Sequence, residues 1–222
     1  MQRVPEPEVM DTLEEAIEYD AMDFTDVNSA FAEYAISLGV TDGLVLDAGT
    51  GTARIPILIC QRCPNLQIIG IDLAQNMLMI GAKNIEQAGL QGQITLELAD
   101  SKALPYADGL FDLIISNSLV HHLPDPLLFF LEVKRVLKLN GAILIRDLIR
   151  PVDTATVNTL VDKIGANYNE HQKILFRDSL HAAFNLEEVK QMFETAGITG
   201  VEIYQSSELH WTAAGCAKAQ NK

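Results

Sequence analysis

The 222-residue sequence has few cysteines and no long apolar run. Three cysteines, an odd number, argue against a disulfide framework and are typical of a reducing compartment. No stretch approaches the ~20 consecutive apolar residues that a membrane helix requires. The first ten residues, MQRVPEPEVM, lack the apolar segment of a signal peptide. We therefore expect a cytoplasmic protein with no membrane insertion.

Basic side chains are also scarce. The chain has 16 Lys and Arg against 30 Asp and Glu, which gives a formal net charge of −14. Proteins that bind nucleic acid or anionic membranes usually present a basic face. The charge therefore argues against both as partners, whereas a hydrophobic content of 48% is that of an ordinary globular protein.

From Leu44 onward, short apolar runs alternate with amphipathic segments. Strands are expected over residues 44–47, 68–72, 94–98, 113–116, 142–146, 198–204 and 209–212. Strands that alternate with helices imply right-handed crossovers and a mostly parallel sheet covered on both faces. The sequence thus predicts an α/β fold, a Rossmann-like doubly wound sheet of seven strands with an antiparallel last strand, plus a helical cap.

The same alternation divides the chain into four parts. They are an N-terminal helical cap segment (1–40), a ligand-binding core (41–147), a helical insert or lid (148–184), and a C-terminal helix with two closing strands (185–222). Within the third part, helices are expected over Thr154–Ile164 and Glu170–Ala183. Asn185 and Glu188 form a capping-box pair that predicts the start of the next helix.

The strongest motif is the segment LVLDAGTGT, which begins at Leu44. A buried strand that ends in an acid and opens into a GxG turn puts bare backbone where a ligand must approach closely. Asp72 ends the next strand and suits a carboxylate that accepts hydrogen bonds from a ribose. A dinucleotide dehydrogenase is the first alternative, but Arg54 occupies the third glycine position of its loop, and Asp47 is awkward beside a pyrophosphate. A positively charged nucleoside is therefore favoured over NAD.

An ordered set of motifs resembles the class I S-adenosylmethionine-dependent methyltransferases. The set consists of Asp47-Ala-Gly49-Thr-Gly51, Asp72, Ala99-Asp100-Ser101, Phe111-Asp112, the run NSLVHHLPD from Asn117, and Arg135-Val-Leu-Lys138. The likeness spans residues 40–147 strongly and 185–212 loosely. Within the family, the sequence most resembles the small-molecule branch that includes the ubiquinone and menaquinone C-methyltransferases. After the Leu-Lys pair the family commonly has Pro-Gly-Gly, whereas this sequence has Asn140-Gly141. We expect this difference to affect only a turn.

The resemblance implies S-adenosyl-L-methionine as the cofactor and a role for each matched residue. The methionine part would lie against Asp47, the loop Gly49, Thr50 and Gly51, and Asn117. The nucleoside part would lie against Asp72 at the ribose, Leu73 and Met77 beside the adenine, Asp100 at the adenine amino group, and the Ser101 backbone at a ring nitrogen.

Methyl transfer from a sulfonium is an in-line displacement, and alignment of donor and acceptor can supply most of the rate enhancement. A base is needed only where the acceptor carries a proton that must leave. His121 and His122, just past the fourth strand, are the candidate catalytic residues. The other interpretation, that they only brace this turn, stays open. Asp147, at the end of the fifth strand beside Arg146 and Arg150, is the candidate substrate contact.

Two other functions remain open: a non-catalytic S-adenosylmethionine-binding regulatory subunit, and methylation of a macromolecule, RNA or protein. Ser116-Asn117-Ser118-Leu119 matches neither of the loops typical of nucleic acid base methylation. It also lacks the carboxylate of metal-dependent O-methyltransferases, so no metal is expected. The acidic composition favours a small-molecule acceptor that is neutral or cationic over a polyanionic one. The sequence gives no indication of the oligomeric state.

Overall fold

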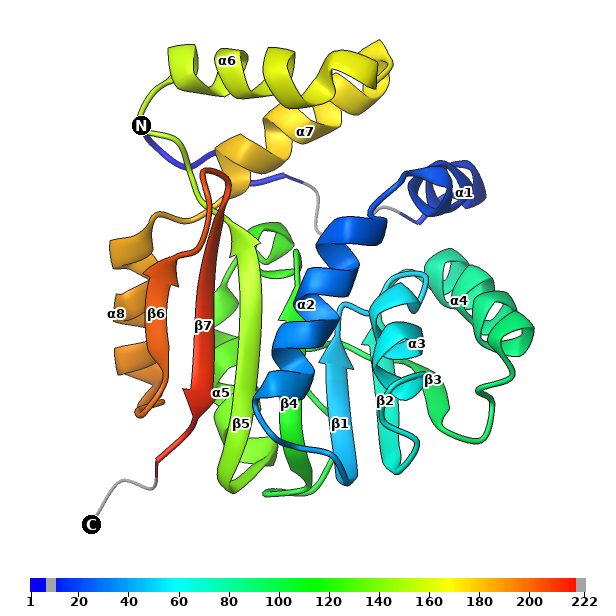
Figure 1. Cartoon of the computed structure of the whole chain (residues 1–222). Helices are drawn as coiled ribbons and strands as arrows, with labels where there is room; N and C mark the ends of the chain where they lie inside the picture. The colour runs from blue at the N-terminus through cyan, green and yellow to red at the C-terminus, as the bar shows by residue number, and fades with distance from the viewer. Residues whose placement is uncertain (7–10, 219–222) are drawn as a thin grey trace.

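A computed structural model describes residues 1–6 and 11–218, and its centre is a seven-stranded sheet of order β3-β2-β1-β4-β5-β7-β6 (Figure 1). The strands are β1 (Gly43–Ala48), β2 (Leu66–Asp72), β3 (Ile94–Leu98), β4 (Phe111–Asn117), β5 (Leu137–Leu148), β6 (Glu202–Gln205) and β7 (His210–Cys216). Neighbouring strands among β1 to β5 are parallel, whereas β7 runs antiparallel to β5 and β6. The predicted fold class is confirmed.

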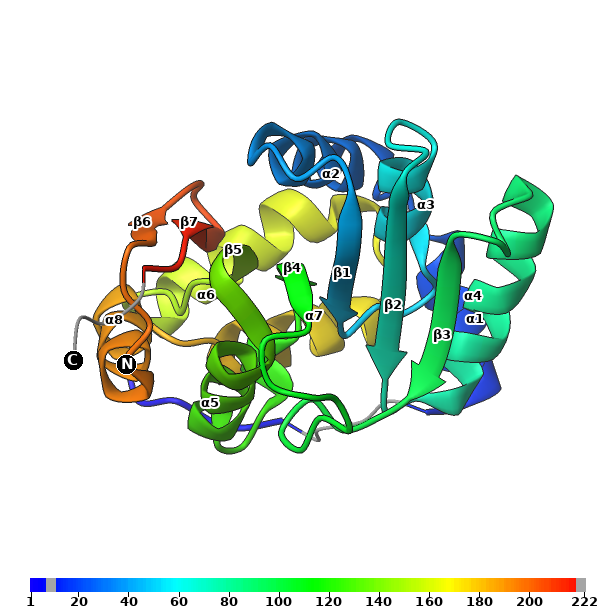
Figure 2. The same cartoon turned by 90° about the horizontal axis from the view of Figure 1, so that it is seen from below.

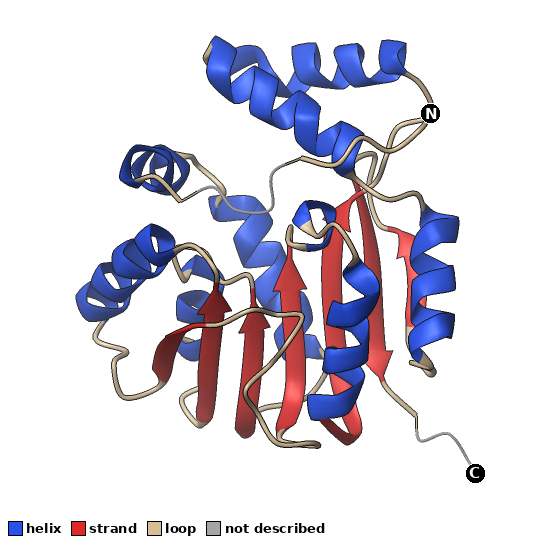
Figure 3. Ribbon diagram, turned by 180° about the vertical axis from the view of Figure 1, so that it is seen from behind, coloured by secondary structure: helices blue, strands red, loops and turns tan. Residues whose placement is uncertain are grey.

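Helices cover both faces of the sheet (Figure 2). One face carries α2 (Thr25–Ser37), α3 (Arg54–Cys60) and α4 (Gln75–Ala88), and the other carries α5 (Pro126–Val136) and α8 (Leu186–Ala196), which lie in front of the sheet in Figure 3. Phe31 and Val45 belong to the first core, and Phe129 and Phe193 to the second. The strands are apolar on both faces because both are buried.

The remaining helices lie beyond the carboxyl ends of the parallel strands (Figure 1). They are α1 (Leu13–Ala21), the short turn η1 (Val120–His122), α6 (Thr154–Ile164), the turn η2 (Gly165–Asn167) and α7 (Glu170–Ala182). The pair α6–α7 has a small core of its own, in which Val157 and Leu180 pack with Leu148 from the end of β5. The insert is therefore attached to the sheet through β5.

Only part of the predicted N-terminal cap segment lies at this edge. Helix α2 instead packs against α3 and the sheet, because Phe31, Ala32 and Ala35 form a buried apolar stripe. Helix α1 does lie at the edge and contacts α4 through Ala16. Residues 7–10 of this segment lie outside the described residues.

Two strand boundaries differ from the sequence prediction. Strand β5 begins at Leu137, earlier than expected, and its pairing with β4 shifts register after Phe111. Gly141 lies inside this irregular stretch, and a Cβ there would come within 2.7 Å of the Leu137 side chain. Strand β6 begins only at Glu202. The predicted capping box of α8 is confirmed, since Asn185 and Glu188 each accept a hydrogen bond from the other's backbone N–H at 2.9 Å.

The strand order reverses between β1 and β4, which lie side by side although they are not consecutive in the chain. Connections leave these two strands toward opposite edges of the sheet and open a crevice at their carboxyl ends, where open α/β sheets bind ligands. The loop after Ala48 and the residues from Asn117 onward flank this crevice. Among the described residues, no helix is long and apolar enough to cross a membrane.

Candidate active site

A cavity of about 480 Å³ lies at this crevice, and most of its lining is apolar. Its floor comes from the ends of β1, β2, β4 and β5, and its walls come from α1, α2, η1 and the α6–α7 pair. Seven of the predicted cofactor residues line it: Gly49, Gly51, Asp72, Leu73, Met77, Ser101 and Asn117. Asp47 and Thr50 line a smaller adjoining pocket of about 30 Å³, which also includes Gly49 and Asn117.

The glycine loop folds back onto the end of β2. The N–H groups of Gly49 and Thr50 both donate to the Ile71 carbonyl at 2.9 Å. Gly49 has a φ of 75°, and a Cβ there would lie 3.0 Å from Leu119. This position therefore favours glycine both for its left-handed backbone and for its close approach to the turn after β4.

Asp72 ties the loop to the next helix. One of its carboxylate oxygens accepts the Gly51 N–H at 2.8 Å, and the other accepts the Ala74 N–H at 2.9 Å. Burial raises the pKa of this carboxyl, and the backbone hydrogen bonds partly oppose that shift. The carboxylate stays on the cavity wall, so its remaining lone pairs can accept from a ligand.

Asp47 is almost fully buried, with 2% of its surface exposed. Burial and the nearby Asp72 carboxylate raise its pKa to about 7. A buried carboxylate of this kind is stabilised by a cation placed beside it. The pocket next to the glycine loop is therefore suited to a positively charged group.

Ser101 lines the cavity, but Asp100 does not. The Asp100 carboxylate lies 2.9 Å from Lys102 Nζ and accepts the Lys102 N–H at 2.9 Å. The Lys102 ammonium and these hydrogen bonds outweigh desolvation and lower the Asp100 pKa. Contact between Asp100 and an adenine amino group therefore stays a prediction.

Arg146 brings a cation to the cavity wall. Its Nε donates to Asn117 Oδ1 at 2.8 Å, and its guanidinium lies 4.8 Å from the centre of the Phe31 ring. Burial lowers the pKa of Arg146 to about 10, so it stays protonated at neutral pH. Its guanidinium also donates to the Val27 carbonyl at 3.3 Å, but among residues 1–6 and 11–218 no carboxylate lies within ion-pair distance of it. It is thus free to pair with a ligand.

His121 is held by Asp147. Asp147 Oδ1 lies 2.5 Å from His121 Nδ1, and Oδ2 accepts the His121 backbone N–H at 3.1 Å. Desolvation lowers the pKa of His121, but the carboxylates of Asp147 and Glu6 outweigh it and raise the value. Asp147 itself is 1% exposed and does not line the cavity. The predicted direct contact of Asp147 with substrate does not match this placement, because the carboxylate lies behind the imidazole.

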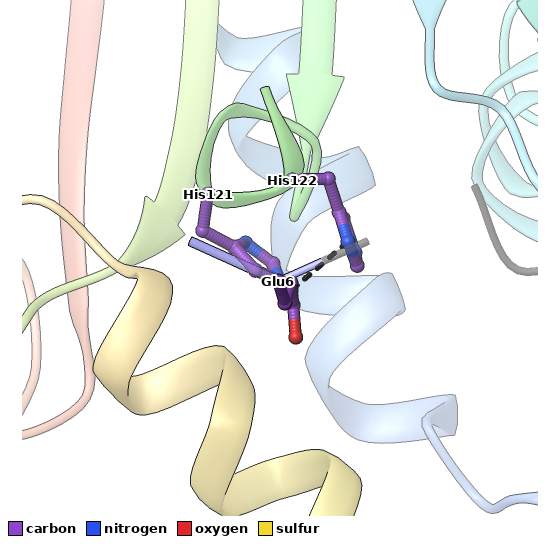
Figure 4. Close-up of side chains that lie close together, drawn as sticks. All are labelled: Glu6, His121 and His122. Atoms are coloured by element: carbon purple, nitrogen blue, oxygen red, sulfur yellow. Dashed lines mark ion pairs between the residues drawn. The ribbon is translucent and has the colours of Figure 1, made fainter. Parts of the chain in front are cut away.

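His122 lies beside His121, and their ring centres are 4.1 Å apart. Both line the cavity and point toward Glu6 (Figure 4). Glu6 was missed by sequence analysis, since nothing in the N-terminal segment indicates that it approaches the fourth strand. Its position follows from contacts of Arg3, which donates to the carbonyls of His121 at 2.9 Å and Ala182 at 2.6 Å.

The insert contributes one apolar wall, which includes Tyr168 and Phe176. Three other polar residues that the sequence placed in this insert are not part of the lining: His171, Arg177 and His181. Tyr19 from α1 also lines the cavity and was not predicted, although its place in an amphipathic segment before the core was a weak signal.

Comparisons with known proteins agree with this geometry. A family model described as "Methyltransferase domain" matches residues 41–197. The ubiquinone/menaquinone biosynthesis C-methyltransferase UbiE of a Geobacter species is 33% identical over 110 residues, which cover 49% of this chain and 47% of that protein. A malonyl-acyl-carrier-protein O-methyltransferase of Geobacter sulfurreducens is 28% identical over 88% of this chain and 71% of its own length.

The fold is also shared with solved structures. A SAM-dependent methyltransferase from Aquifex aeolicus superposes with a TM-score of 0.71 at 17% identity, covering 93% of this chain and 99% of that one. The chain spans about half the length of the UbiE relatives that it matches. At these identities the likeness to solved structures concerns the fold alone.

Proposed function

The chain belongs to the class I S-adenosylmethionine-dependent methyltransferase family, and from this premise we propose that it transfers the cofactor's methyl group to a small-molecule acceptor bound in the 480 Å³ cavity. The observation that carries the proposal is this cavity, which joins the glycine loop at one end to His121 and His122 at the other. One space thus offers room for donor and acceptor in line.

The cofactor occupies the end formed by β1 and β2. The pocket beside Asp47 takes the ammonium of the methionine part, because no cation among the described residues is paired with this buried carboxylate. Asp72 accepts hydrogen bonds from the ribose, and Leu73 and Met77 flank the adenine. Asn117, which lines both pockets, lies between the cofactor and Arg146.

The acceptor occupies the end formed by η1 and α7. Its walls are mostly apolar, with Tyr168 and Phe176 on the insert side and Arg146 on the sheet side. This lining favours an apolar molecule that carries one carboxylate or other oxygen anion opposite Arg146. The overall acidic charge still disfavours a polyanion, but it does not set the charge inside the cavity. In place of the neutral or cationic acceptor expected from the sequence, we therefore propose an acceptor with a single anionic group.

Methyl transfer breaks the bond between sulfur and the methyl carbon and forms a bond between that carbon and the acceptor atom. The cofactor leaves as the neutral thioether S-adenosylhomocysteine. Where the acceptor atom carries a proton, His121 and His122 are the candidate bases at the acceptor end. Asp147 acts through His121, whose ring it holds in place.

The experiment is a methyl-transfer assay with labelled S-adenosylmethionine and matched acceptors. Apolar carboxylic acids are compared with their amides and amines. Arg146→Met should raise KM for a carboxylate acceptor by about ten- to a hundredfold, since a charge-assisted hydrogen bond contributes about 1.5–3 kcal/mol. Arg62→Met, at an exposed arginine outside the cavity, is the matched control.

Two outcomes contradict the proposal. If the cofactor binds and no small acceptor is methylated while an RNA or protein is, the substrate class is wrong. If Arg146→Met and Arg62→Met behave alike toward every acceptor, Arg146 does not select the acceptor's charge.

A further inference from the structure

Three side chains of types that commonly bind metals converge at the acceptor end of the cavity (Figure 4). Glu6 comes from the N-terminal segment, and His121 and His122 come from η1. Their ligand atoms all lie within 4.8 Å of one another. We propose that Glu6, His121 and His122 form a binding site for a divalent transition-metal ion, contrary to the expectation from sequence that the chain has no metal site.

The distances suit a shared ion. Glu6 Oε1 lies 3.5 Å from His121 Nε2 and 2.9 Å from His122 Nδ1. Zn²⁺ binds nitrogen and carboxylate oxygen at about 2.0–2.2 Å in tetrahedral sites, which places two ligand atoms about 3.3 Å apart. The two observed distances lie on either side of this value, and the ligand atoms of the two histidines lie within 4.8 Å of each other, so side-chain rotations can bring the three atoms around one centre.

His122 Nδ1 supplies a second, independent indication. It is buried and has no hydrogen-bond partner among the described residues. Glu6 Oε1 is near enough, at 2.9 Å, but the direction between the two atoms does not meet hydrogen-bond geometry. A buried polar atom without a partner is destabilising because nothing compensates its lost hydration, and coordination of Nδ1 to an ion removes that cost.

The surroundings hold the ligands in place. Asp147 binds Nδ1 of His121, so that Nε2 is the ring atom directed at Glu6. A carboxylate behind a ligating histidine is the usual outer-shell arrangement of metal sites. Ser179 of α7 donates to Glu6 Oε2 at 3.2 Å, and the Val4 N–H donates to the His181 carbonyl at 3.0 Å. The N-terminal segment is therefore fixed to α7 close to Glu6.

The ligand set selects the class of ion. Two imidazoles and one carboxylate suit Zn²⁺, Co²⁺ or Fe²⁺, whereas Mg²⁺ and Ca²⁺ prefer oxygen ligands alone. The carboxylates of Glu6 and Asp147 balance the charge of a dication. Three protein ligands leave at least one coordination position open, and both histidines line the cavity, so this position faces the acceptor space.

An ion in this position would bind and polarise an oxygen atom of the acceptor, and this role would replace that of His121 and His122 as bases, since a ligating imidazole nitrogen cannot accept a proton. That role rests on the proposed function, but the metal site itself does not. The two can therefore be tested separately on the same protein.

The test is metal titration of the full chain after chelator treatment and dialysis. Calorimetry with Zn²⁺ and the visible absorption of Co²⁺ should both report one ion per chain, with no displacement by excess Mg²⁺. Glu6→Gln and His122→Phe should each weaken binding at least tenfold, and Asp147→Asn by about ten- to a hundredfold. His171→Phe, at an exposed histidine of α7 outside the cavity lining, is the matched control and should bind as the wild type does.

Melting curves identify any variant that fails to fold. The metal affinities of the folded variants then test the proposed site. Absence of a one-to-one Co²⁺ complex, or equal binding by His122→Phe and His171→Phe, would overturn the proposal. S-adenosylmethionine affinity measured on the same samples keeps the two claims apart. Metal binding without cofactor binding refutes the proposed function alone, and cofactor binding without metal binding refutes only the metal site.

Discussion

The buried carboxyl of Asp47 makes the stability of the cofactor-free protein depend on pH. In the folded chain its pKa rises from the ordinary 3.8 to about 7, with burial as the largest cause and the Asp72 carboxylate as a smaller cause in the same direction. An acid whose folded pKa is raised stabilises the fold fully below its unfolded pKa and loses that contribution as pH rises through the folded value. The window of loss is therefore about pH 4 to 7.

Asp47→Asn removes the charge and keeps the shape and the hydrogen-bonding oxygen. A rise of about three pKa units corresponds to about 4 kcal/mol, which is the upper bound of the effect above the window. Between about pH 5.5 and pH 8, the variant should gain about 2 kcal/mol in free energy of unfolding relative to the wild type. The gain should grow with pH and level off above about pH 7.

Urea denaturation of both proteins at the two pH values measures this difference, without cofactor and at matched ionic strength. Asp47→Asn should lower the affinity for the cofactor although it raises stability, since it removes the carboxylate partner of the ammonium. A difference in unfolding free energy that is the same at both pH values would refute the reasoning, because it would mean that Asp47 does not titrate within this window.

The cavity residues and the helices that cover them can be tested one at a time. Asp72→Ala should weaken cofactor binding about ten- to a hundredfold in calorimetry while the protein stays folded, because a charge-assisted hydrogen bond to the ribose is lost; unchanged affinity would reject the ribose role. Gly49→Ala should lower the melting temperature, since its φ of 75° strains any side chain and a Cβ would meet Leu119 at 3.0 Å; an unchanged melting temperature would show that the loop adapts. Hydrogen exchange should slow on cofactor binding more in residues 11–24 and 154–183 than in the sheet, as expected of a mobile cap; equal exchange with and without ligand would exclude that role.

The sheet could be predicted from sequence because its signals are local. Buried strands, the capping pair Asn185 and Glu188, and the glycine loop each depend on residues close together in the chain. The irregular start of β5 could not be read in this way. Its pairing with β4 shifts register between Phe111 and Leu113, and such an irregularity between two strands is not encoded in the apolar pattern of either strand.

The site was predictable where strand ends fix the side chains, and less so elsewhere. Asp47 and Asp72 follow from the strand pattern, since parallel strands bring their carboxyl ends together. Glu6 does not, because its approach to His121 depends on long-range contacts of Arg3. Asp147 was recognised as a residue of this edge, but sequence could not tell that its carboxylate lies behind His121.

The central claim is that the crevice beyond β1, β2 and β4 binds S-adenosylmethionine, and calorimetry tests it most directly. The wild-type chain is titrated with S-adenosylmethionine, with S-adenosylhomocysteine and with NAD. The account predicts one site per chain for the first two ligands, with affinity for S-adenosylmethionine reduced in Asp72→Ala, and no binding of NAD. Binding of NAD without binding of either S-adenosyl compound would contradict it.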